Sequence, residues 1–67
     1  MMNTIYKVVS FGGMEGRTLE TDYYDTEVNA KNRIANDTWN KGFRLYKVTI
    51  TVDEEGRLVP QEERIEL

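Results

Sequence analysis

The sequence predicts an α+β fold of the form β-β-α-β-β, with two similar hairpins in a mostly antiparallel four-stranded sheet and one helix on one face. Three observations lead to this prediction. Two strand-like segments occur on each side of one helical stretch, glycine-containing turns separate the strands of each pair, and the pairs match each other at an offset of 40 residues. The sequence leaves open the order of the strands across the helix.

The first predicted hairpin covers residues 4–23. Residues 4–11 (TIYKVVSF) are rich in the β-branched and aromatic side chains that strands favour. Three glycines in residues 12–16 suit a turn, because glycine tolerates positive φ angles. Residues 17–23 (RTLETDY) alternate between two sides, which is typical of a half-exposed strand.

The helix is predicted to run from about 27–41. Thr26 is a favoured N-cap residue, and Glu27 in the first turn suits the positive end of the helix dipole. Gly42 occupies the position at which a left-handed residue commonly ends a helix. The helix therefore joins the two hairpins and can cover one face of the sheet.

The second hairpin begins with the strongest strand signal in the chain, residues 43–52 (FRLYKVTITV). Residues 53–56 (DEEG) predict a type I turn with Gly56 at the bulge position. Pro60 cannot donate a ladder hydrogen bond, so the last strand should either lie at an edge of the sheet or end there. Residues 61–67 are compatible with a continued strand or with a frayed tail.

One side of the helix and one side of each strand define the expected core. Its members are Leu19, Val28, Ile34, Trp39, Tyr46, Val48 and Ile50. Tyr6 and Val8 are expected to face the helix with them. Ile5, Val9 and Phe11 then point to the opposite side, which one helix cannot cover, and an uncovered apolar patch is typical of an interface. These three residues are therefore candidate partner-binding residues, and a symmetric homodimer through this face or through an edge strand is expected.

The internal repeat supports the two-hairpin arrangement. Residues 6–8 (YKV) match residues 46–48, and residues 15–17 (EGR) match residues 55–57. Two hairpins of equal length from strand to turn would produce this match. The alternative is that strands favour Tyr and Val, and turns favour Glu and Gly, without further equivalence.

The composition sets bounds on the chemistry. The 67 residues form a single small domain, 1–67, with 12 Asp and Glu, 9 Lys and Arg and a net charge of −3. The chain contains neither Cys nor His, which removes thiol nucleophiles and the commonest general base and metal ligand. We therefore expect no enzyme, no cofactor and no metal site. The acidic balance disfavours nucleic-acid binding, and no apolar stretch is long enough for a membrane helix.

A stripe of asparagines is a second candidate partner-binding surface. Spacings of three, four and four residues place Asn29, Asn32, Asn36 and Asn40 on one side of the predicted helix, and Arg33 borders them. Asparagine is a mediocre helix former, and a local departure of this kind often marks function. An ordinary solvated helix face is the alternative.

Two segments carry a resemblance to known proteins. Residues 25–27 (DTE) at the helix start and residues 41–48 (KGFRLYKV) resemble those of small phage and prophage open reading frames. The resemblance implies a setting, because small phage proteins of this kind often bind and block one host protein, including defence nucleases and immune effectors. It carries no site residue with it.

These observations together predict a small protein-binding module, a phage-type inhibitor of a bacterial host defence protein that acts by steric occlusion. The expected partner is a bacterial protein, and the expected location is the cytoplasm of the bacterial host. Two alternatives remain. One is a homo-oligomeric structural or accessory protein without an external target, and the other is a partial nucleic-acid mimic.

Overall fold

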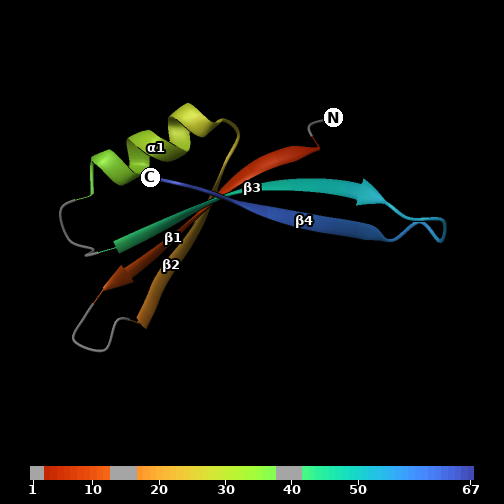
Figure 1. The fold of residues 1–67 in the computed structure, drawn as a ribbon, viewed down its shortest axis with the longest axis horizontal. Helices are drawn as coiled ribbons and strands as arrows, with labels where there is room; N and C mark the ends of the chain where they lie inside the picture. Colours follow the sequence, from red (N-terminus) through yellow and green to blue (C-terminus); the bar gives the residue numbers. More distant parts are fainter. Residues whose placement is uncertain (1–2, 13–16, 38–41) are drawn as a thin grey trace.

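The computed structural model describes residues 3–12, 17–37 and 42–67, and it consists of one antiparallel sheet with one helix (Figure 1). The elements are β1 (Thr4–Gly12), β2 (Arg17–Tyr24), α1 (Glu27–Ala35), β3 (Gly42–Val52) and β4 (Leu58–Ile65). The strand order is β2-β1-β3-β4, so β1 and β3 are central and β2 and β4 are edges. The predicted α+β fold is confirmed, and the strand order that the sequence leaves open is now assigned.

The helix starts where the sequence predicts and ends earlier. The Thr26 hydroxyl accepts a hydrogen bond from the backbone N–H of Asn29 at 3.2 Å, which confirms the N-cap. Asn36 is the C-cap, so the predicted continuation to residue 41 is wrong at residues 36–37. Asn36 and Asp37 are poor helix formers, and a carboxylate is unfavourable at the negative end of the helix dipole. Residues 38–41 lie outside the described residues.

The pairing of β1 with β3 decides which side chains face α1. Val8 lies opposite Leu45, and directly opposed residues in an antiparallel pair share a face of the sheet. Val8 and Leu45 are both fully buried and pack with Ala30 of α1. The side of β3 that contains Leu45 therefore faces the helix. The predicted arrangement, with Tyr46, Val48 and Ile50 towards the helix, is wrong.

The observed core is smaller than the predicted one. Val8, Ala30 and Leu45 form its centre, and partly buried apolar side chains surround them: Tyr6, Tyr24, Ile34, Phe43 and Ile65. The positions of Tyr6, Val8 and Ile34 agree with the prediction, and Val48 is buried as predicted, although on the opposite face of the sheet. Val28 is 67% exposed and does not belong to the core. Trp39 and the side chain of Leu19 lie outside the described residues.

The repeated Tyr-Lys motif pairs with itself at the centre of the sheet. Tyr6 lies opposite Lys47, and Lys7 lies opposite Tyr46. The first strands of the two hairpins are therefore adjacent and antiparallel. As a result Tyr6 faces α1 and its repeat partner Tyr46 faces the other way, so the sequence match does not extend to the direction of the side chains.

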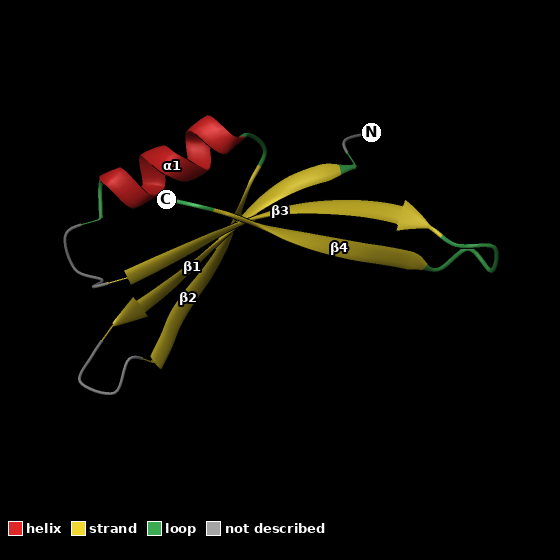
Figure 2. Cartoon of the chain, viewed as in Figure 1, coloured by secondary structure: helices red, strands yellow, loops and turns green. Residues whose placement is uncertain are grey.

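The second hairpin projects away from α1 (Figures 1 and 2). Gly56 has a φ of +82° at its turn, and the Gly56 N–H donates to the carbonyl of Asp53 at 3.1 Å, which confirms the predicted turn and bulge. β4 is an edge strand, as Pro60 predicts, and it continues to Ile65, so most of residues 61–67 is strand.

The elongated shape leaves a large surface. The radius of gyration is 13.6 Å, against about 11 Å expected for a compact domain of this length. The accessible surface is 5183 Å², against about 4,400 Å² expected for a monomer of this mass. The chain therefore exposes about 800 Å² more than a compact monomer would.

Replacement of the central side chain should test the register. Leu45→Ala should lower the free energy of unfolding by about 2–5 kcal/mol, because it leaves a cavity beside Val8 and Ala30. Leu67→Ala is the matched control, since Leu67 is 65% exposed and should tolerate the change. Denaturant unfolding measures both, and equal losses would contradict this core.

Ser10 offers a second test of the core, because its side chain is fully buried and its hydroxyl has no hydrogen-bond partner among the described residues. Ser10→Ala should leave stability unchanged or raise it by about 1 kcal/mol, because it removes a buried polar group that has lost its water. The same unfolding experiment measures the change. A loss of stability would show that the hydroxyl makes a bond that holds the core.

Candidate functional site

The candidate site is the face of the sheet opposite α1, which we call the open face. Cross-strand pairing assigns to it the odd-numbered residues of β1, the even-numbered residues of β3 and β4, and Thr21 and Tyr23 of β2. In the part of the chain that the structure describes, no element lies over this face (Figure 2). The open face is therefore accessible to a partner.

One half of the open face combines cations with aromatic rings. The Arg44 guanidinium lies 4.9 Å from the centre of the Phe11 ring, and the Lys7 ammonium lies 4.8 Å from the centre of the Tyr46 ring. Both distances are within the range of cation–π attraction. Tyr23 lies opposite Lys7 and is 61% exposed. We call these five residues the cation–aromatic half.

The other half of the open face is aliphatic and extends along the projecting hairpin. It consists of Ile5, Val48, Ile50, Val52, Leu58 and Pro60, which we call the aliphatic half. Val48 is only 4% exposed, although it faces away from α1. Val52 and Leu58 lie opposite each other and are 64% and 68% exposed. Apolar side chains this exposed on adjacent strands are typical of an interface.

The charge on the open face differs in sign from that of the whole chain. Lys7, Arg44 and Arg64 lie on this face together with one carboxylate, Glu62, whereas the chain has a net charge of −3. The Lys7 ammonium also pairs with the Glu62 carboxylate at 2.5 Å. The open face is therefore suited to an acidic surface.

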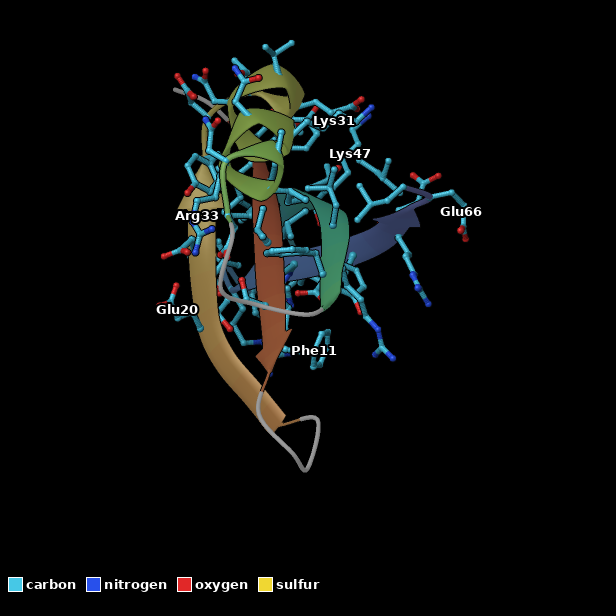
Figure 3. The ribbon with its side chains drawn as sticks, turned by 90° about the vertical axis from the view of Figure 1, so that its left-hand side faces the viewer. Phe11, Glu20, Lys31, Arg33, Lys47 and Glu66 are labelled. Atoms are coloured by element: carbon cyan, nitrogen blue, oxygen red, sulfur yellow. The ribbon has the colours of Figure 1, made fainter. Side chains whose placement is uncertain are left out.

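Arg33, the cation of the predicted asparagine stripe, is engaged within the molecule. Its guanidinium lies 2.8 Å from a Glu20 carboxylate oxygen, 3.6 Å from Asp22 and 2.6 Å from Asp37. The hydrogen bond to Asp37 is the main reason that the pKa of Arg33 is raised. Figure 3 shows Arg33 and Glu20 beside β2, away from Phe11 at the end of β1. Arg33 therefore ties the helix to β2.

The asparagines of the predicted stripe have separate environments. The Asn29 side chain donates to an Asp25 carboxylate oxygen at 2.9 Å, and Asn36 caps the helix. Asn32 is exposed on α1, and Asn40 lies outside the described residues. Asn29, Asn32 and Asn36 therefore keep the predicted spacing along α1 and its C-cap and share one side of the helix, which stays a candidate surface.

The three apolar residues predicted on β1 do lie together. Ile5, Val9 and Phe11 are half-buried on the open face. The residues of β3 on the same face are the ones that sequence reasoning assigned to the core. The charge of Lys47 favours the wrong assignment, because Lys47 shares its side of β3 with Leu45 and is nevertheless exposed.

Neither a metal centre nor a membrane helix is found in the described parts of the chain. Within residues 3–12, 17–37 and 42–67, no three Asp or Glu side chains are grouped as they would be around a metal ion. None of the helices in the same ranges is long and apolar enough to cross a membrane.

Comparison with known protein families, with curated protein sequences and with solved structures finds no match for this chain.

The acidic turn of the second hairpin uses its charge for its own folding. One Asp53 carboxylate oxygen accepts hydrogen bonds from the backbone N–H groups of Arg57 and Glu55, both at 2.9 Å. The other oxygen lies 3.1 Å from the Arg57 side chain. The hydrogen bond from the Arg57 N–H is the main reason that the pKa of Asp53 is lowered, and the other bonds lower it further. The turn is therefore a structural feature and a weak candidate for a cation site.

The lowered pKa of Asp53 gives a pH-dependent prediction. Its carboxylate should stabilise the fold fully above the unfolded pKa of about 4, and this contribution should be lost as pH falls through the lower folded pKa. Asp53→Asn should therefore reduce the fall in stability on acidification, as measured by denaturant midpoints at several pH values. Glu54→Gln is the matched control in the same turn and should keep the acid sensitivity of the wild-type protein. An Asp53→Asn variant with the full acid sensitivity of the wild-type protein would contradict the prediction.

Proposed function

We propose that this protein is a small protein-binding module that covers an acidic surface of one bacterial protein with its open face and inhibits that protein by steric occlusion. The observation that carries the proposal is the cation–aromatic half, a set of paired cations and rings on a sheet face that α1 leaves uncovered. Aromatic residues and arginine are enriched where protein interfaces draw their binding energy.

The small core supports a partner. Val8, Ala30 and Leu45 form its fully buried centre, and a chain of this kind gains stability from any partner that binds only its folded form. Binding and folding are therefore linked in this proposal.

The charges support the choice of an acidic protein surface. Among the described residues Arg44 and Arg64 make no ion pair, and the Glu62 carboxylate on the same face is engaged by Lys7. A nucleic acid would also attract these cations. The net charge of −3 on the whole chain favours a protein, because a nucleic acid would be repelled by the rest of the surface.

The resemblance to small phage proteins supplies the host setting of the proposal, in which the target is a bacterial defence protein in the cytoplasm. A partial nucleic-acid mimic is less well supported. Glu20, Asp22 and Asp37 are paired with Arg33, which reduces the charge that such a mimic would present.

Charge reversal on the two sides of β3 should test the proposal. Arg44→Glu places a carboxylate on the open face, and Lys47→Glu makes the same change at an exposed position on the opposite face. Tagged wild-type protein and both variants are incubated with bacterial lysate, with and without nuclease and at low and high salt. We expect one stoichiometric protein with the wild type and with Lys47→Glu, and on the order of tenfold less with Arg44→Glu.

Equal capture by the two variants would contradict the proposal that the open face is the binding surface. Loss of the captured material after nuclease treatment would favour nucleic acid as the ligand instead. Both variants are first checked for wild-type denaturant unfolding, so that lost capture reports on the surface rather than on the fold.

A further inference from the structure

We propose that the aliphatic half of the open face is covered by a second copy of this chain, so that two protomers pack sheet against sheet about a two-fold axis. This inference deepens the proposed function, because it rests on the open face as the binding surface. It divides that face between two partners, with the second copy on the aliphatic half and the acidic target on the cation–aromatic half.

The apolar side chains at the end of the hairpin need a cover that this chain does not provide. Val52 and Leu58 are each about two-thirds exposed, and Ile50 opposite Pro60 continues the patch towards the centre of the sheet. The described helix lies at the other end of the molecule and on the other face (Figure 1). The aliphatic half therefore has no intramolecular partner among the described elements.

The area agrees with a dimer. The surface of 5183 Å² exceeds that of a compact monomer by about 800 Å². A stable interface of standard size buries about 800 Å² on each of its two sides. One contact between two copies would bring each protomer close to the exposed area of an ordinary folded protein.

Charge selects this half of the face for self-association. None of the six residues of the aliphatic half is ionisable, and the neighbouring Glu62, opposite Val48, is paired with Lys7, so two copies can meet there without repulsion. The neighbouring half contains Lys7 and Arg44, and two such surfaces would repel each other in a symmetric contact. A two-fold contact therefore falls on the aliphatic half and leaves the cations for a different, acidic partner.

The edge of β4 is less suited to joining two sheets. The N–H of Asp53 donates to the carbonyl of Arg57, so these two residues form a hydrogen-bonded pair. Because hydrogen-bonded and non-hydrogen-bonded pairs alternate along an antiparallel ladder, the backbone of Pro60 faces away from β3. Proline has no N–H to offer to an added strand, and Glu62 and Arg64 place charges along the same edge. Packing of faces is therefore favoured over pairing of these edges.

Sedimentation equilibrium over a range of protein concentrations tests the inference. We expect a mass approaching 15.6 kDa, twice the protomer mass of 7.8 kDa, for the wild-type chain. Val52→Lys and Leu58→Lys should each raise the dimer dissociation constant on the order of tenfold or more, because each places a charge in an apolar contact. Thr51→Lys, on the opposite face of the same strand, is the matched control and should remain dimeric.

A wild-type mass of 7.8 kDa at every concentration would overturn the inference, and so would dimers that persist in both open-face variants or species larger than a dimer. Because Val52 and Leu58 are exposed in the protomer, their variants should remain folded as monomers, which circular dichroism verifies, and their stability should fall only by the amount that dimerisation contributes. A monomer whose target capture still depends on Arg44 would overturn only the dimer. Capture that is independent of Arg44 would overturn the proposed function.

Discussion

The contact between Val8 and Leu45 is the interaction on which the rest of the structure depends. These residues are opposed in the two central strands and are buried together beneath Ala30. Because side chains alternate along a strand, this one contact assigns every other residue of β1 and β3 to a face. A shift of one residue in the β1–β3 register would bring Tyr46 and Val48 under the helix and expose Leu45. The position of the open face is thus a consequence of the core.

Much of the fold could be predicted from local signals. Thr26 and Gly56 have side-chain and backbone properties that act within a few residues, and the helix start and the second turn were both predicted correctly from them. The facing of β3 could not be predicted in the same way. Its two sides are both partly apolar, with Leu45 on one and Val48 on the other, so only the long-range pairing with β1 distinguishes them. The early end of α1, by contrast, has a local cause, because Asn36 and Asp37 are poor helix formers.

Part of the candidate site could also be predicted from a local signal, the pattern of β1. Ile5, Val9 and Phe11 were placed on the uncovered face because β1 alone indicated it, whereas the contribution of Tyr46 and Arg44 depended on the register. Arg33 was expected to be available to a partner and instead connects α1 to β2 through ion pairs with Glu20 and Asp22. The positive charge that remains for a partner is thereby concentrated on the open face, in a chain that is acidic overall.

We propose that the open face is the surface through which this protein binds both its target and a second copy of itself. Nuclear magnetic resonance with a soluble paramagnetic probe tests it most directly, by comparing methyl signals in dilute protein, in concentrated protein and with the captured target. We expect Val52 and Leu58 to become protected from the probe as the protein concentration rises. Val9 should become protected when the target is added, while Val28 on the helix stays accessible under all conditions. Protection of Val28 with continued exposure of Val9, Val52 and Leu58 would contradict the account.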